Sequence, residues 1–255
     1  MMRIRVESAN GVGRITLARP EKKNALDLAA ARELREALRG FAADHDVRVV
    51  LLAADGDDFC AGADLAALNA LLDTDSATQL ADAEALGDVF RVMREMPQVV
   101  VAAVRGRALA GGAGLATACD IVIAHEGARF GYPEVRVGFV PAMVMAILHR
   151  LAGEKRAFEL VATGRQVHAK EAFELGLVSR VIAAANFDAD IEKFVSDLAS
   201  SPAGALRTTK RLFYDLDGMS FDDGIALAAR VNVEARATAE FREGIRRFAS
   251  PLQKP

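Results

Sequence analysis

Residues 109–115 read Leu-Ala-Gly-Gly-Ala-Gly-Leu, and they follow the apolar run Val-Val-Val-Ala-Ala-Val at residues 99–104. A short run this rich in valine predicts a buried strand, so the glycines are expected at a corner where a strand gives way to a helix. Backbone N–H groups at such a corner can point at a ligand oxygen. Glycine and alanine suit this role because a larger side chain would hold a substrate away from the main chain. The stretch therefore predicts an anion-stabilising turn.

Glu134 follows this turn in the sequence, directly after Pro133, which restricts the backbone at that point. Its near neighbours along the chain are apolar: Phe130, Tyr132, Val135 and Val137. A carboxyl group in apolar surroundings has a raised pKa, which suits proton transfer near neutral pH. Glutamate is rarely buried, however, so the residues alone favour a surface loop. Both interpretations stay open at this point.

Composition indicates an ordinary globular chain. It has 255 residues, of which 52% are hydrophobic and 26% charged, with a net charge of −3, and this fits one or two domains with a sizeable core. No block of like charges marks a surface for nucleic acid or for an anionic membrane, so we expect neither partner. The first residues lack the apolar segment of a signal peptide, and the apolar run at 139–148 contains a proline and is too short to span a bilayer. We therefore expect a cytoplasmic protein.

Cysteines and histidines give no metal pattern. Cys60 and Cys119 lie far apart without CxxC spacing, which argues against a zinc site or a disulfide framework. Cys119 has no obvious base beside it, so we expect buried, reduced thiols. The four histidines are scattered and are expected to be structural or surface residues: His45, His125, His149 and His168. We expect no metal site.

Periodicity and turn residues predict an α/β core followed by a mostly helical C-terminal third. Residues 4–8 and 13–17 predict a hairpin around Asn10-Gly11, and Asp27 is placed to cap a helix that runs to about residue 43. Further strands are expected at 47–53, 121–124, 128–131 and 177–182. Further helices are expected to start at Asp64 and near residues 79, 142, 154, 169, 188, 203 and 221.

Three common site types are excluded by the residues themselves. A dinucleotide-binding turn does not fit, because Gly112-Ala113-Gly114 lacks a third glycine and the following helix is too short for a parallel crossover. A phosphate-binding P-loop would need a Gly-Lys-Ser/Thr sequence after the glycines. A serine hydrolase is excluded because no serine occurs between Val101 and Val178.

Several blocks of sequence, in their order and spacing, resemble the enoyl-CoA hydratase/isomerase (crotonase) superfamily, and the resemblance covers nearly the whole chain. The blocks are residues 19–26 (RPEKKNAL), 59–65 (FCAGADL), 106–115 (GRALAGGAGL), 118–121 (ACDI) and 130–135 (FGYPEV). The resemblance implies a β-β-α spiral core over residues 1–195 and a helical C-terminal trimerisation region over residues 196–255. It also implies a homotrimer or a hexamer built as a dimer of trimers.

The same resemblance implies roles for individual residues. The backbone amides of Ala63 and Gly111 would form an oxyanion hole that stabilises the enolate oxygen of a CoA thioester, and Glu134 would be the catalytic acid/base. An acyl-CoA substrate would bind bent, with its nucleotide end near Lys22 and Ala25. The remaining substrate-binding residues would be Ala61, Asp64, Leu65, Gly114 and Pro133, with Phe248 closing over a neighbouring subunit's site. The CoA thioester is the substrate, so no cofactor is expected.

One departure from the family pattern bears on the reaction. Typical hydratases carry a second glutamate, which would fall on Gly114. One carboxylate is enough to shuttle a proton in an isomerisation, whereas two carboxylates make it easier to hold the water of a hydration. Against this, residues 110–115, 134–138 and 140–142 resemble branched or glutaconyl-type hydratases, in which the glycine would leave room for a substrate branch or a second water.

We therefore expect an enoyl-CoA hydratase that acts on a 2-enoyl-CoA through an oxyanion hole and one glutamate. A Δ3,Δ2-enoyl-CoA isomerase with Glu134 as its sole proton shuttle is the first alternative. A catalytically weak acyl-CoA-binding relative is the second.

Overall fold

A six-stranded sheet forms the centre of the computed structural model, which describes residues 3–249 and the side chains up to Arg247. The strand order is β1-β2-β3-β4-β6-β9. β1 (Ile4–Ala9) and β2 (Val12–Leu17) form the predicted antiparallel hairpin. Asn10 and Gly11 turn it with φ angles of 53° and 79°, as a tight hairpin turn requires. The strands that follow are all parallel to one another: β3 (Val49–Ala54), β4 (Val99–Val104), β6 (Ile121–His125) and β9 (Arg180–Ile182).

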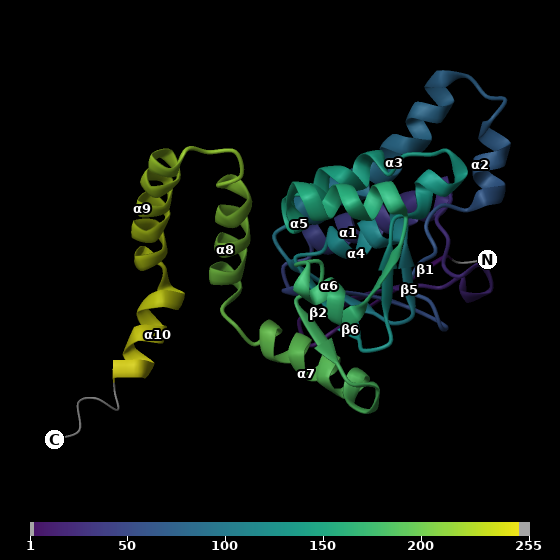
Figure 1. The fold of residues 1–255 in the computed structure, drawn as a ribbon. Coiled ribbons are helices and arrows are strands. Elements are labelled where there is room, and N and C mark those ends of the chain that lie inside the picture. The colour runs from purple at the N-terminus through teal and green to yellow at the C-terminus, as the bar shows by residue number, and fades with distance from the viewer. Residues whose placement is uncertain (1–2, 250–255) are drawn as a thin grey trace.

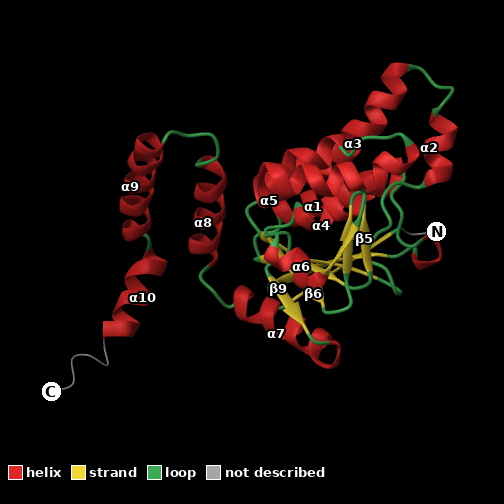
Figure 2. Cartoon of the chain, viewed as in Figure 1, coloured by secondary structure: helices red, strands yellow, loops and turns green. Residues whose placement is uncertain are grey.

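The valine-rich strand β4 is buried on both faces of this sheet. Because successive side chains of a strand point to opposite faces, its residues divide between two apolar clusters. One cluster holds Val100, Ala102 and Val104 together with residues of the helices α1 (Leu28–Ala43) and α3 (Ser76–Glu95). The other holds Val99, Val101 and Ala103 together with residues of α7 (Phe187–Ala199). Figures 1 and 2 show the strands between these helix layers. The continuous apolar pattern of β4 follows from this burial.

A second, smaller sheet lies next to the glycines. It joins β5 (Arg107–Leu109) and β7 (Arg129–Gly131) in parallel, and β8 (Gln166–His168) pairs with β7 in the antiparallel direction. β5 and β8 are not predictable from the sequence, because three residues are too few to show a period. With β5 in place, the helix α4 (Gly111–Thr117) follows this short strand rather than β4, and the glycines lie inside its first turns. The glycines therefore lie at a corner between a strand and a helix, as predicted, but the strand that precedes them is β5 and not β4.

Most predicted helix starts agree with the structure to within a residue or two. Asp27 caps α1 by accepting a hydrogen bond from Ala30 N, and Asp64 caps α2 (Leu65–Leu71) in the same way. α3 begins at Ser76, earlier than predicted, because Asp75 accepts a hydrogen bond from Thr78 N. α5 (Ala142–Thr163) joins two predicted helices across a break at Gly153, and α6 (Ala169–Glu174) follows it. The short 3-10 turns are η1 (Pro20–Lys22), η2 (Pro133–Val137) and η3 (Ala184–Asn186).

The chain ends in α8 (Ala203–Asp215), α9 (Phe221–Ala237) and α10 (Ala239–Ala249), which stand away from the sheet in Figure 1. α7 extends across residue 195, where the division between core and C-terminal region was placed, and ends at Ala199 on the sheet. Lys210 ties α8 to the core: its buried Nζ donates to Met93 O at 2.6 Å and lies 2.8 Å from the carboxylate of Asp120. None of the helices within residues 3–249 is long and apolar enough to cross a membrane.

Candidate active site

Gly111 begins α4, and its backbone is set by a strained residue before it. Ala110 has φ 52° and ψ −128°, a combination that L-residues rarely adopt. Hydrogen bonds hold it there: Ala110 N donates to Gly131 O at 2.8 Å, and Ala110 O accepts from Gly114 N at 3.0 Å. The first N–H groups of a helix have no acceptor within it, and that of Gly111 has none elsewhere in residues 3–249. This amide is therefore available to a ligand.

Ala63 presents a second amide. It pairs with Leu26 in an isolated parallel bridge, in which Leu26 N donates to Gly62 O and Asp64 N donates to Leu26 O, both at 2.8 Å. In this pattern the bonded groups belong to the residues on either side of Ala63, so the N–H of Ala63 itself points the other way. Ala63 is exposed and Gly111 is half-buried, so both amides lie where a ligand can reach them.

Two glycines bring these amides together. A Cβ placed on Gly62, which has φ 98°, would lie 2.8 Å from Ala110 Cβ and 3.4 Å from Gly111 N. A Cβ on Gly112 would lie only 2.3 Å from the carbonyl oxygen of Cys60. Small residues were expected here so that a substrate could approach the main chain, but Gly112 is small because α4 packs directly on residue 60. Larger residues would push the two amides apart.

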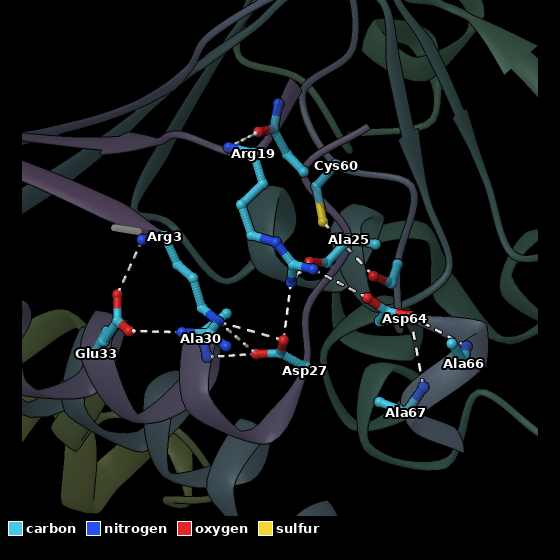
Figure 3. A network of polar contacts seen from close by, with 12 residues as sticks. Arg3, Arg19, Ala25, Asp27, Ala30, Glu33, Cys60, Asp64, Ala66 and Ala67 are labelled. Atoms are coloured by element: carbon cyan, nitrogen blue, oxygen red, sulfur yellow. Dashed lines mark hydrogen bonds and ion pairs between the residues drawn. The ribbon is translucent and has the colours of Figure 1, made fainter. Parts of the chain in front are cut away.

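The segment that carries Ala63 is braced by ion pairs, shown in Figure 3. Arg19 donates to Asp27 Oδ2 at 2.9 Å and to Asp64 Oδ2 at 3.1 Å. Burial acts to raise the pKa of Asp64, but hydrogen bonds from the α2 amides and from Arg19 bring it below its ordinary value. Asp64, predicted to contact substrate, thus has its carboxylate engaged in capping α2 and binding Arg19. The network also includes Arg3, which contacts Asp27.

Asn24 is a structural residue of the site whose role was not predicted from the sequence. It is buried with φ 54°, and its Nδ2 donates to Asp55 O at 2.9 Å and to Asp58 O at 2.8 Å. These bonds join the loop after β2 to the loop after β3. An asparagine tolerates the left-handed region better than most residues, which was the one local signal for this position.

The predicted substrate-binding residues of these two loops lie on neighbouring segments. Ala61 N donates to Lys23 O at 3.0 Å, which places the segment of Lys22 and Ala25 beside that of Ala61. Lys22 is exposed at the end of η1, whereas Ala25 is buried and its carbonyl accepts from Arg19 at 3.2 Å. Leu65 is 74% exposed at the start of α2. Phe248 lies outside the described side chains, so its predicted role stays a prediction.

Glu134 lies in η2, the turn that Pro133 begins. Its side chain is buried, with 8% of its surface exposed, and its Oε2 is buried with no hydrogen-bond partner within residues 3–249. Burial raises the pKa of this carboxyl. The surface-loop interpretation of Glu134 is therefore wrong. The predicted apolar surroundings are half right: Phe130 and Tyr132 are fully buried, but the turn directs Val135 and Val137 to solvent.

The remaining candidate side chains are those of the two cysteines and the four histidines. Both cysteines are buried thiols as predicted, and burial raises the pKa of Cys60 to about 12. Three histidines are exposed, and His125 packs its ring edge-on against Phe187 at 5.4 Å. Among residues 3–249 no group of three His, Cys, Asp or Glu side chains could hold a metal ion.

Gly114, where a second glutamate would fall, does not face open space. A Cβ built on it would lie 2.5 Å from Val144 Cγ2 and 3.2 Å from Phe90 Cζ. The expectation that this glycine leaves room for a substrate branch or a second water was wrong, because α3 and α5 fill that volume.

Comparison with known proteins identifies the family of the chain. The family model for enoyl-CoA hydratase/isomerase matches residues 7–254. The chain belongs to this family. A Thermus thermophilus relative named "Putative enoyl-CoA hydratase" is 41% identical to it over 245 residues, which is 96% of each chain.

Solved structures confirm the crotonase fold that the sequence blocks imply. The enoyl-CoA hydratase of Mycobacterium smegmatis matches with a TM-score of 0.94 at 32% identity, over 98% of this chain and 97% of that one. Human enoyl coenzyme A hydratase domain-containing protein 3 matches with a TM-score of 0.93 at 27% identity, over 100% and 99%. The mixed α/β core and the helical C-terminal region are therefore those of the crotonase superfamily.

Proposed function

We propose that the protein is an enoyl-CoA hydratase that acts on a 2-enoyl-CoA thioester. The amides of Ala63 and Gly111 would donate to the thioester oxygen, and Glu134 would be the acid/base. Negative charge develops on that oxygen when a nucleophile adds to the conjugated double bond, and two fixed donors stabilise it. Glu134 would take a proton from water as its oxygen bonds to the β-carbon, and a proton would return from Glu134 to the α-carbon.

The burial of Glu134 is the observation that carries this proposal. A surface glutamate would be ionised at neutral pH and fully hydrated, and it would be a weak base. Burial raises the pKa of the Glu134 carboxyl, which makes it a stronger base than a surface glutamate, and its Oε2 has no partner within residues 3–249, so it is free to accept and return a proton. The family's relatives carry hydratase names, which supports the same reaction class.

A Δ3,Δ2-enoyl-CoA isomerase is the second candidate, and Gly114 favours it. A single carboxylate that removes a proton from one carbon and returns it to another needs no second acid and no bound water. The packing of Val144 and Phe90 at Gly114 leaves no place there for a second carboxylate. A catalytically weak acyl-CoA-binding relative is the third candidate, and it differs from the others in not needing Glu134 at all.

The CoA thioester itself would bind along the joined loops. We propose that Lys22 and Ala25 meet the nucleotide end, and that the backbone around Ala61, Asp64 and Leu65 lines the pantetheine. Gly114 and Pro133 would lie at the acyl end. The proposed reaction uses the protein's own groups together with the substrate, so we expect no cofactor requirement.

Turnover assays decide among these candidates. The purified protein is incubated with crotonyl-CoA, with a branched glutaconyl-CoA and with a 3-enoyl-CoA, and the masses of the products are measured by mass spectrometry. A product heavier by one water identifies hydration, and an unchanged mass with a shifted double bond identifies isomerisation. If neither occurs, and Glu134→Gln binds CoA thioesters as well as the parent, the weak binder is the remaining candidate.

We also propose a homotrimer or a dimer of trimers in the cytoplasm. Large apolar side chains of the C-terminal helices are exposed in the single chain, including Phe213, Phe221, Ile225 and Val233. Exposed apolar surface of this kind favours association between chains. Light scattering coupled to size-exclusion chromatography gives the mass directly, and a monomeric mass at micromolar concentration would contradict the proposal.

A further inference from the structure

Three helices meet tightly over the first turns of α4. A Cβ on Gly111 would lie 3.3 Å from Leu86 Cδ2 of α3, and a Cβ on Gly87 of α3 would lie 3.3 Å from Met143 Sδ of α5. At Gly114 the approach is closest, with Val144 Cγ2 at 2.5 Å. Small residues of α3 and α4 thus lie opposite large apolar residues of α3 and α5. Apolar side chains of α3 and α5 therefore cover this part of α4.

Val144 is poorly able to move out of this contact. Its side chain is buried, with 3% exposed, and it lies in the first turns of α5. A β-branched side chain in a helix has one strongly preferred χ1 rotamer, so a new neighbour cannot be accommodated by a simple rotation. A distance of 2.5 Å between carbon atoms is far below van der Waals contact. Any side chain at residue 114 therefore requires a shift of α5 or of α4, which carries the Gly111 amide.

We propose that Val144 is the residue that restricts the site to one carboxylate. Its methyl groups occupy the volume into which a side chain at residue 114 would project, so the acid/base chemistry is left to Glu134. Replacing Val144 with alanine removes Cγ2 and Cγ1, which lie 2.5 Å and 3.3 Å from the Gly114 Cβ position, and leaves Phe90 Cζ at 3.2 Å. A glutamate at residue 114 would then fit on the wall of the site. This inference rests on the proposed function only in assigning the acid/base role to Glu134.

A double-mutant cycle tests, without any substrate, whether Val144 excludes a side chain at residue 114. Gly114→Ala, Val144→Ala and the double variant are compared by equilibrium unfolding in urea. Forcing a methyl group into a packed core is destabilising, so Gly114→Ala alone is expected to lower the folding equilibrium constant by about tenfold or more. In the double variant that penalty should largely disappear relative to Val144→Ala. Additive effects of the two substitutions would overturn the proposal.

Gly40→Ala is the matched control for this cycle. Gly40 also lies in a helix, α1, but a Cβ there has no heavy atom within 4 Å. Because alanine is the better helix former, this substitution is expected to leave the protein as stable as the parent or more so. The contrast with Gly114→Ala separates the effect of the Val144 contact from the general effect of replacing a helical glycine.

The second experiment tests whether Val144 restricts the site to one carboxylate, by placing a second carboxylate at residue 114. Gly114→Glu is combined with Val144→Ala, and Gly114→Gln with Val144→Ala is its uncharged counterpart. Hydration of crotonyl-CoA by the glutamate double variant is expected to be at least about tenfold faster than by the glutamine one, since a positioned acid or base contributes at least that much. Equal rates would overturn the proposal. Whether the parent hydrates crotonyl-CoA at all is read separately and judges the proposed function.

Discussion

The two sides of the candidate site are built by opposite means. On the amide side, the segment of Ala63 is held by a backbone bridge and by the ion pairs of Arg19, and the N–H groups of Ala63 and Gly111 have no acceptor within residues 3–249. On the carboxyl side, Glu134 is held by a proline turn and by burial, and its Oε2 has no partner. A donor must be fixed in position, whereas an acid/base must be able to change its protonation state. The difference between the sides follows from these two requirements.

The largest expected effect is on the carboxyl side. Glu134→Gln keeps the shape but cannot transfer a proton, so turnover is expected to fall by about 10²–10⁴-fold, the usual contribution of a general acid/base. Steady-state kinetics on the active substrate measures it. Glu174→Gln, which changes an exposed glutamate, is the control and should retain full activity. Retention of parental turnover by Glu134→Gln would remove the functional reason for the difference between the sides.

On the amide side, Gly112→Ala is expected to be the most damaging single change. Its Cβ would lie 2.3 Å from Cys60 O, a backbone atom that cannot rotate away. Overpacking typically destabilises by about 1–3 kcal/mol and by more when backbone must move. Urea unfolding gives the loss of stability, and activity should fall with it because the Gly111 and Ala63 amides separate. A Gly112→Ala protein with parental stability would show that α4 does not rest on residue 60.

Arg19→Gln tests the ion-pair brace. Arg19 and its partners Asp27 and Asp64 are largely buried, so removing the cation leaves two carboxylates close together. We expect a loss of about 1–3 kcal/mol in the free energy of unfolding. Lys193→Ala is the comparison, because its pair with Asp197 is solvent-exposed and is expected to contribute under about 1 kcal/mol. Equal losses in the two variants would contradict a special role for the brace.

The smallest expected effect is the dependence of stability on pH at Glu134. Its pKa is raised in the folded protein, so the unfolded chain releases this proton at a lower pH than the folded chain does. The contribution of Glu134 to stability is therefore present below the ordinary carboxyl pKa of 4.5 and is lost as pH rises through the folded-state value.

Glu134→Gln removes this dependence. The variant is expected to be more stable than the parent at neutral pH, and the difference should shrink as pH falls below the ordinary carboxyl pKa. Urea unfolding across this pH range measures it. A variant that is less stable than the parent at neutral pH would show that the ionised carboxylate is stabilised in the fold, contrary to its unpartnered oxygen.

Local chemistry made several features of this protein predictable from its sequence. Asn10-Gly11 prefers the positive φ angles of a hairpin turn, Asp27 and Asp64 have the side chains that cap helices, and the valine run of β4 matches a strand buried on both faces. The sequence blocks also led to the family, because motifs of that kind combine residue type with spacing. Each of these signals lies within a short stretch of chain.

Tertiary structure decided what short stretches cannot encode. The three-residue strands β5 and β8 exist because of their pairing with β7, the turn after Pro133 decides that Glu134 is buried while Val137 is exposed, and Val144 reaches Gly114 from another helix. From the sequence alone, Gly114 indicates only that the second glutamate of typical hydratases is absent. The packing of α5 on α4 shows that Val144 occupies the space beside Gly114. This contact could not be predicted from the sequence, because van der Waals exclusion depends on which residues the fold brings together.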